Sequence, residues 1–239
     1  MSQHITILCS TYGRPRQCEE MLSCFLKQTH PDRELIILND KHNQTLSFSH
    51  ELVTVINAAD RFRTLGLKLN QLLNLAPNHG LVQYWDDDDI YLPDHLTYSL
   101  EHHARFKTPV SKHMAQWYDG GHKLYRIGTA AWMNTVLAER DILLALGGFS
   151  QVHNNSCVSI MHRLLQAGHI NGPQRFDDRM PTFIYRQDDG RHHVSTEEPT
   201  AAHQSMEQHA DPAHGVVDLL PHWREDYLAK ATASWAALP

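Results

Sequence analysis

Hydrophobic and polar positions follow two different periods along the chain. Short apolar runs rich in β-branched residues predict buried strands, and apolar positions recurring every three to four residues predict amphipathic helices between them. The expected strands of the first half are 5–9, 34–38, 51–57 and 81–85, and the expected helices are 16–28, 65–76 and 95–106. Strands that alternate with helices favour an α/β fold with a mixed, mainly parallel sheet flanked by helices.

The second half of the chain alternates less regularly. Here the expected elements are a strand over 132–136, helices over 139–146 and 159–167 that end at glycines, and a strand over 182–186. Residues 196–216, rich in Glu, Pro, Ala, Gln and His, predict a connector, and the tail from 219 to 238 predicts a helix that packs back on the domain.

Composition narrows the class of protein. The 239 residues are 41% hydrophobic and 20% charged, which suits a globular chain and excludes intrinsic disorder. A formal charge of -6 argues against a general polyanion binder, and the 19 histidines are interpreted as solvated surface. No apolar run approaches the roughly 20 residues that span a bilayer, and the N-terminus passes straight into a strand-like run. A soluble, cytoplasmic protein is therefore expected.

Four consecutive aspartates are the most informative feature. Asp86 to Asp89 directly follow the apolar strand 81–85, so their mutual repulsion at a strand end needs an offset. A divalent cation such as Mg²⁺ or Mn²⁺ supplies one, because hard cations prefer carboxylate oxygens and complete their shell with phosphates and water. The alternative is an acidic, solvated turn. The four cysteines show no metal-ligand spacing and are expected to be reduced thiols.

Several segments together resemble the family 2 glycosyltransferases of the GT-A fold. Residues 5–15 (ITILCSTYGRP) are similar to the N-terminal signature of that family, and residues 34–40 to its second strand with a terminal acidic residue. Residues 84–94 (YWDDDDIYLPD) look like the DxD region, and residues 147–149 like the later GGF segment. The resemblance covers residues 4–190.

This resemblance implies a Rossmann-like GT-A fold and a metal-dependent transfer of sugar from a nucleotide-diphosphate sugar, with UDP as the expected nucleotide. Residues 1–195 would form the catalytic domain, with a nucleotide-sugar-binding half (1–94) and an acceptor-side half (95–195), and 196–239 the connector and helical tail. The implied cofactor is Mn²⁺ or Mg²⁺, which stabilises charge on the departing diphosphate.

The resemblance also implies roles for individual residues. Asp40 would hydrogen-bond the base. Asp88 and Asp86 would form the metal site, in which Asp88 binds the metal directly and Asp86 contacts the ribose or bound water. Asp89 would be either an additional ligand or a residue that supports the ligands from behind. Lys68 would contribute a charge to phosphate, although a solvated helix lysine is nearly as plausible. The implied nucleotide-sugar-binding residues are Ser10, Thr11, Tyr12, Arg14, Asp40, Gly66, Lys68, Asn70, Asp86 and Asp87.

One departure from the family pattern affects the mechanism. The family carries an acidic pair before the helix that contains Arg163, and those positions hold Ser156 and Cys157 here. Neither is a convincing general base, so both inverting and retaining mechanisms stay open. Other candidates for this role are His153, Asp177, Asp178, Asp188 and Asp189, of which Asp188 and Asp189, together with Asp88, are the expected catalytic residues.

The loop 185–195 is the second segment of interest. In similar enzymes a C-terminal loop closes over the donor, and we expect His193 to act as a further metal ligand. Arg186 and Arg191 are expected to meet phosphates. Trp117 and Trp132 either line the acceptor site or, more simply, pack in the core.

The acceptor stays open. A saccharide or lipid-linked saccharide is the commonest acceptor in the family, and a hydroxymethylated nucleic-acid base, a protein or a small molecule are the alternatives. Two other functions are kept: a non-catalytic nucleotide-sugar-binding module, favoured by the missing acidic pair, and a nucleotidyltransferase. The oligomeric state is not predicted.

Overall fold

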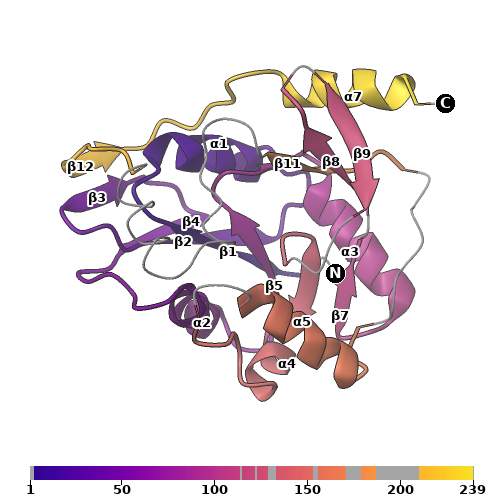
Figure 1. Cartoon of the computed structure of the whole chain (residues 1–239), viewed down its shortest axis with the longest axis horizontal. Coiled ribbons are helices and arrows are strands. Elements are labelled where there is room, and N and C mark those ends of the chain that lie inside the picture. Colours follow the sequence, from indigo (N-terminus) through magenta and orange to yellow (C-terminus); the bar gives the residue numbers. More distant parts are fainter. Residues whose placement is uncertain are drawn as a thin grey trace.

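The structure is a computed structural model of the chain (Figure 1). It describes residues 3–113, 115–121, 123–128, 133–152, 156–170, 179–186 and 210–238. Helices lie on both faces of a central sheet, as the alternating pattern predicts.

The central sheet has six strands within these ranges, in the order β4-β2-β1-β5-β10-β7. Neighbouring strands among β4, β2, β1 and β5 run parallel, whereas β10 is antiparallel to both of its neighbours. The strands are β1 (Ile5–Thr11), β2 (Arg33–Asn39), β4 (Val53–Asn57), β5 (Leu81–Asp86), β7 (Val110–Lys112) and β10 (Val136–Glu139).

Alternation along the strands separates two hydrophobic cores. On β1, Ile5, Ile7 and Cys9 face one core, and Leu8 faces the other. The first core takes up the apolar side of α1, and the second takes up α2, α4 and α5. The parallel strands carry apolar side chains on both faces of the sheet, and helices cover each face.

Local sequence explains where the helices begin. Pro15 occupies the first turn of α1, where its missing N–H costs nothing. The Thr64 side chain accepts a hydrogen bond of 3.2 Å from Leu67 N at the start of α2. The described helices are α1 (Pro15–Leu26), α2 (Leu65–Leu75), α3 (His95–Phe106), α4 (Arg140–Ala145), α5 (Ser156–Gln166) and α7 (Tyr227–Ala236).

A second sheet, with strand order β6-β11-β8-β9, lies beside the first. Strand β11 pairs in parallel with β8 and antiparallel with β6, which follows the aspartate run directly. Strand β12 pairs in parallel with β3 far away in the sequence. These strands are β6 (Ile90–Tyr91), β8 (Ala115–Asp119), β9 (Leu124–Gly128), β11 (Phe183–Arg186), β3 (Gln44–Ser47) and β12 (Gly215–Asp218).

Two expected elements differ in position. The strand expected over 132–136 begins only at Val136, where the ladder with β5 and β7 starts, and continues to Glu139. The tail helix begins at Tyr227 rather than 219, because Pro221 interrupts the pattern and the Asp226 side chain caps the helix by accepting from Ala229 N. In the part of the chain described, no helix is long and apolar enough to cross a membrane.

Candidate active site

The carboxyl ends of three parallel strands bring the candidate residues together. Ser10 lies opposite Asp86 in the pairing of β1 with β5, and Thr11 lies opposite Asn39 in the pairing of β1 with β2. The end of β1 with the residues that follow it (10–14, here called the β1 loop), Asp40 and the aspartate run therefore meet at one edge of the sheet. Ligands of open α/β sheets bind at such an edge.

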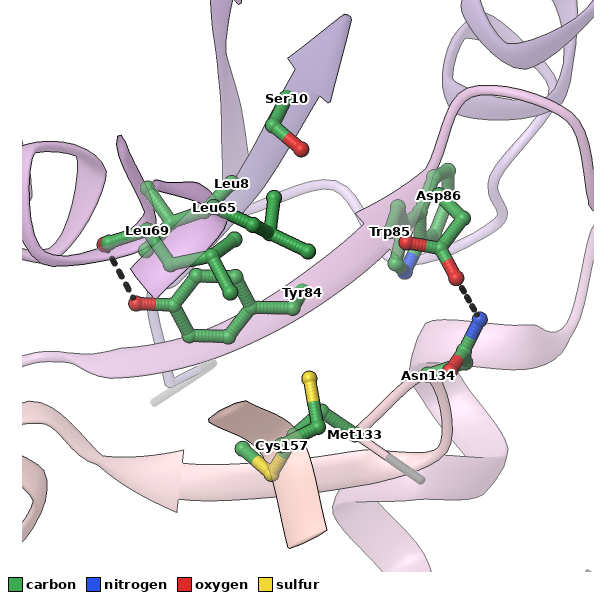
Figure 2. A pocket seen from close by; sticks show the side chains of 10 residues that line it. All are labelled: Leu8, Ser10, Leu65, Leu69, Tyr84, Trp85, Asp86, Met133, Asn134 and Cys157. Carbon is green, nitrogen blue, oxygen red and sulfur yellow. Dashed lines mark hydrogen bonds between the residues drawn. The ribbon is translucent and has the colours of Figure 1, made fainter. Parts of the chain in front are cut away.

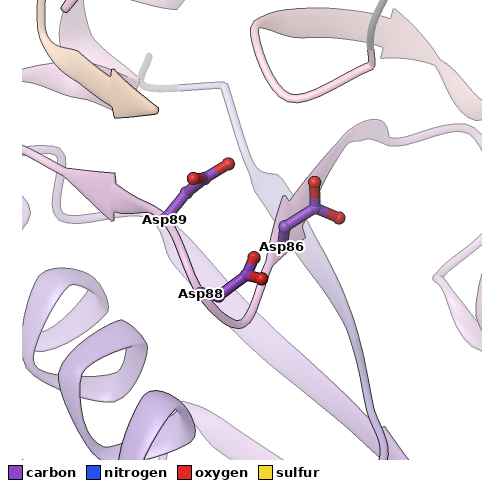
Figure 3. Close-up of side chains that lie close together, drawn as sticks. All are labelled: Asp86, Asp88 and Asp89. Carbon is purple, nitrogen blue, oxygen red and sulfur yellow. The ribbon is translucent and has the colours of Figure 1, made fainter. Parts of the chain in front are cut away.

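Three of the four aspartates form a cluster. Asp86 ends β5, and Asp88 and Asp89 lie in the turn to β6, so that one carboxylate oxygen from each lies within 4.8 Å of the other two (Figure 3). Asp88 and Asp89 are buried, whereas Asp86 is exposed to solvent. Carboxylate oxygens are ligands that suit Mg²⁺ and Mn²⁺ in proteins, and the exposed Asp86 leaves the cluster open to solvent on one side.

Electrostatics in this cluster favour a bound cation. Although Asp86 is exposed on one side, the protein atoms around its carboxyl group desolvate it, and this desolvation, followed by the charge of Asp88, raises the pKa of Asp86 to about 7. Burial, with the charges of Asp88 and Asp86, raises the pKa of Asp89 well above its usual range. A divalent cation would stabilise the ionised forms of Asp86 and Asp89 beside Asp88, so the residues fit the implied metal.

Asp87 is not part of this cluster and bonds to residues at the end of β1 and just after it. Its carboxylate accepts hydrogen bonds from Thr11 Oγ1 at 2.6 Å and from Arg14 Nη1 at 3.0 Å. The same Arg14 nitrogen lies 2.9 Å from Asp88 Oδ2. The charge of Asp87, and then that of Asp88, raises the pKa of Arg14 against the opposing effect of burial. Asp87 thus fastens the β1 loop to the cluster.

Asn134 joins the first and last aspartates of the cluster. Its side-chain amide donates to Asp86 Oδ2 at 2.5 Å and to Asp89 Oδ2 at 3.0 Å. The amide therefore holds the two carboxylates at a fixed spacing. Asn134 was not singled out in the sequence, where no motif surrounds it.

The expected base-binding carboxylate is buried and paired. Asp40 Oδ1 lies 2.5 Å from Lys68 Nζ, and Asp40 Oδ2 accepts a hydrogen bond of 3.0 Å from Phe62 N. Lys68 also donates to Thr11 O at 2.5 Å. Burial lowers the pKa of Lys68, although the charge of Asp40 opposes that shift. Lys68 thus anchors Asp40 to the β1 loop, and its ammonium is buried rather than open to a phosphate.

Tyr12 lies under two cations. Arg61 Cζ is 4.2 Å and Lys41 Nζ 5.2 Å from the centre of its ring. The ring itself is buried, with 3% exposure. Arg61, which we did not single out from the sequence, therefore lies at the expected nucleoside end of the site.

Gly66 and Asn70 hold α2 against the turn 147–150. A Cβ on Gly66 would lie 1.8 Å from Ser150 O, so only glycine permits this approach. The Asn70 side chain accepts from Phe149 N at 2.7 Å and donates to Phe149 O at 2.9 Å. Asn70 thus contacts the GGF segment, and Gly66 contacts the residue that follows it.

A pocket opens beside Asp86 (Figure 2). Ser10 and Asn134 contribute polar groups, whereas most of the remaining wall is apolar. Cys157 also lines the pocket, at the second position of the missing acidic pair, and burial raises the pKa of its thiol to about 12. The lining residues are Leu8, Ser10, Leu65, Leu69, Tyr84, Trp85, Asp86, Met133, Asn134 and Cys157.

Two further residues singled out from the sequence are buried inside the protein. Trp117 has 0% exposure and donates from Nε1 to Pro181 O, which supports the core-packing interpretation. Arg186 is 3% exposed, and its guanidinium contacts Asp88 O and Glu20 rather than open solvent. The remaining candidates, His153, Asp177, Asp178, Asp188, Asp189, Arg191, His193 and Trp132, lie outside the described residues.

Comparison with solved structures identifies the fold. S. aureus TarS 1-349 in complex with UDP-GlcNAc is 13% identical with a TM-score of 0.64, over 88% of this chain and 68% of that one. A longer TarS structure is covered over only 37% of its length, at 13% identity and a TM-score of 0.60 over 77% of this chain. Mannosyltransferase PcManGT from Pyrobaculum calidifontis, in complex with GDP-Man and Mn²⁺, is 16% identical with a TM-score of 0.56, over 87% of this chain and 62% of that one.

These likenesses confirm the GT-A α/β fold expected from the sequence, with its mainly parallel sheet flanked by helices. No family model and no curated protein sequence matches the chain. At identities of 13–16% the likeness concerns the fold, and the chain spans about a third to two thirds of these neighbours.

Proposed function

We propose that the chain is a metal-dependent glycosyltransferase that moves a sugar from a nucleotide-diphosphate sugar, with UDP as the preferred nucleotide, to a hydroxyl acceptor. The observation that carries the proposal is the cluster of Asp86, Asp88 and Asp89 at the sheet edge where the β1 loop and Asp40 also lie. Structural neighbours solved with UDP-GlcNAc and with GDP-Man and Mn²⁺ support it.

In this proposal different residues of the chain bind different parts of the nucleotide-sugar donor. Asp40, an acceptor of hydrogen bonds, would receive the ring N–H of uracil, which cytosine lacks. Asp86, Asp88 and Asp89 would hold Mn²⁺ or Mg²⁺ against the diphosphate, where the cation supplies Lewis-acid stabilisation of the leaving group. Asn134 and Arg14 would fix the orientation of these carboxylates.

The position of Cys157 favours a second candidate, a non-catalytic nucleotide-sugar-binding module. Its thiol stays protonated near neutral pH and cannot accept a proton from an acceptor hydroxyl. A transferase would then use a base elsewhere, for example Asp188 or Asp189, or a retaining mechanism. Turnover distinguishes the two candidates, because a binding module holds the donor without releasing its nucleotide.

The test is release of nucleoside diphosphate from a panel of UDP-, GDP- and CDP-sugars, with and without Mn²⁺. Candidate acceptors are saccharides, lipid-linked saccharides and hydroxymethylated DNA. We expect release from a UDP-sugar that requires Mn²⁺ and rises with one acceptor class. Asp88→Asn should lower the rate about 100-fold or more, since several kcal/mol of charge stabilisation depend on the metal.

Asp218→Asn is the matched control, because Asp218 is exposed at the end of β12. It should retain the wild-type rate. Metal-dependent donor binding without release would favour the binding module, and release unaffected by Asp88→Asn would exclude the proposed role of the cluster.

A further inference from the structure

The C-terminal segment covers one side of α1. It runs from β12 along this helix to α7 (Figure 1). Leu220 N donates to Glu19 Oε1 at 3.0 Å, Trp223 Nε1 lies 3.2 Å from Cys24 Sγ, and Lys27 Nζ lies 5.1 Å from the centre of the Trp223 ring. The helical period places Glu20 and Lys27 opposite the apolar stripe of α1, so this segment covers a face that would otherwise meet solvent.

Glu20 is the centre of a buried ionic cluster under this segment. Its carboxylate has 0% exposure and accepts from Tyr227 OH at 2.6 Å and from Arg224 Nε at 2.8 Å. Arg186 Nη1, from β11, lies 2.9 Å from Glu20 Oε2 and also donates to Tyr227 OH at 2.8 Å. Two residues of the C-terminal segment thus share one carboxylate with Arg186.

Arg186 also contacts the cluster of Asp86, Asp88 and Asp89. Its Nε donates to Asp88 O at 2.7 Å, and its backbone N donates to Asp89 Oδ1 at 3.0 Å. Arg186 therefore binds both the backbone of the turn that carries the aspartates and the Asp89 carboxylate, while Glu20 and Tyr227 bind its guanidinium. The guanidinium makes its bonds to Asp88 O and to Glu20 from two separate nitrogens, Nε and Nη1, whereas lysine offers a single nitrogen at the end of its side chain.

We propose that Glu20 and Tyr227 position Arg186 and that Arg186 positions the aspartate cluster. Through these positioning residues the C-terminal segment sets the affinity of the cluster for its divalent cation. The inference rests on the proposed function, because it assumes that Asp86, Asp88 and Asp89 bind the metal. Residues that orient metal ligands through hydrogen bonds change metal affinity or activity about 10- to 100-fold when they are replaced.

The experiment is a calorimetric titration of the full chain with Mn²⁺, accompanied by a thermal unfolding curve for each variant. We expect Arg186→Lys to weaken Mn²⁺ binding about 10-fold. Tyr227→Phe, which removes a single hydroxyl beside Arg186, should weaken it a few-fold. The second variant keeps the test valid if Arg186→Lys does not fold.

Lys230→Met is the matched control. Lys230 anchors the same helix α7 by bonds to Asp119 at 3.0 Å and Gly121 O at 2.9 Å, but it does not contact Glu20 or Arg186. It should lower the melting temperature and leave Mn²⁺ affinity unchanged. The affinity would then depend on the Glu20 cluster and not on the general stability of α7.

Three outcomes would overturn the inference. If the wild type binds Mn²⁺ and Tyr227→Phe and Arg186→Lys both bind it equally well, the inference fails while the proposed function stands. If Lys230→Met weakens binding as much as Tyr227→Phe, the effect is general loosening and the inference fails again. If the wild type itself does not bind Mn²⁺, the proposed function fails and the inference with it.

Discussion

At the scale of single residues, four adjacent aspartates perform different tasks. Asp87 is satisfied by Thr11 and Arg14, and it fastens the β1 loop. Asp89 accepts from the backbone of β11, while Asp86 opens to solvent at the end of β5. The turn between β5 and β6 brings the carboxylates of Asp86, Asp88 and Asp89 together (Figure 3), whereas Asp87 bonds to Thr11 and Arg14.

Glu20 provides a pH prediction at this scale. Burial alone would raise its pKa, but the hydrogen bond from Arg224 and the charge of Arg186 outweigh burial and lower the pKa to about 2, from an ordinary value of 4.5. A lowered carboxylate pKa stabilises the fold above pH 4.5, and this contribution is lost as the pH falls toward 2.

We therefore expect Glu20→Gln to lower the free energy of unfolding at pH 7 by about 3 kcal/mol, since it leaves the buried guanidinium of Arg186 without its carboxylate. The difference from wild type should shrink as the pH falls from 4.5 to 2. Denaturant unfolding followed by tryptophan fluorescence at several pH values measures it. A difference that is constant over this range would show that Glu20 is not held ionised by its partners.

The aspartate cluster could be predicted from the sequence, whereas its supports could not. A charged run directly after an apolar strand is a local signal, and it located Asp86, Asp88 and Asp89. Asn134, Glu20 and Tyr227 gave no such signal, because their partners are distant in the sequence. Glu20 even lies on the side of α1 that periodicity assigns to solvent, and it is buried there by Arg186 of β11 and by the C-terminal segment.

At the scale of elements, the close contact between α2 and the turn 147–150 controls one side of the pocket. Gly66 lets the helix approach Ser150 O, and Asn70 binds both backbone groups of Phe149. Leu65 and Leu69 on the same helix line the pocket beside Asp86. A shift of α2 away from the turn would therefore change the pocket.

Gly66→Ala tests this contact. The new methyl group would lie 1.8 Å from a backbone oxygen, so helix and turn must separate. Alanine favours a helix by about 1 kcal/mol over glycine, but an overpacked contact of this kind costs about 1–3 kcal/mol or more, and we expect a net loss of stability. Thermal unfolding measures the change.

Gly80→Ala is the control for that substitution. A Cβ on Gly80 would meet only Pro77 O, at an ordinary contact distance of 3.7 Å. Its melting temperature should stay close to that of the wild type. Equal melting temperatures for both variants would mean that the close approach at Gly66 does not constrain the helix.

The principal elements were predictable because their patterns are local. Strands β1, β2 and β5 are continuous apolar runs, and α1 and α2 carry clear helical stripes, so hydrophobic periodicity located each within a few residues. The short strands β3, β6, β7, β8, β9 and β12 were not predicted. They exist through pairing with distant segments, as β8 does with β11 and β12 with β3, which sequence periodicity does not reveal.

At the scale of the whole molecule, the fold brings the β1 loop, Asp40 and the aspartate cluster to one edge of the sheet, with the pocket beside Asp86. The C-terminal segment contacts Arg186 of β11 through Tyr227, and Arg186 in turn bonds to Asp88 O. In the proposed function, a divalent cation at the cluster holds the diphosphate of a uridine nucleotide.

The most direct test compares the binding of UDP and uridine by calorimetry, with and without Mn²⁺, in the wild type and in Asp88→Asn. A cation that bridges the carboxylates to phosphate should tighten UDP binding at least 10-fold and leave uridine unchanged. Asp88→Asn should remove the effect of Mn²⁺ on UDP. Equal UDP affinity with and without Mn²⁺ in the wild type would contradict the proposed binding of the diphosphate through a cation at the aspartate cluster.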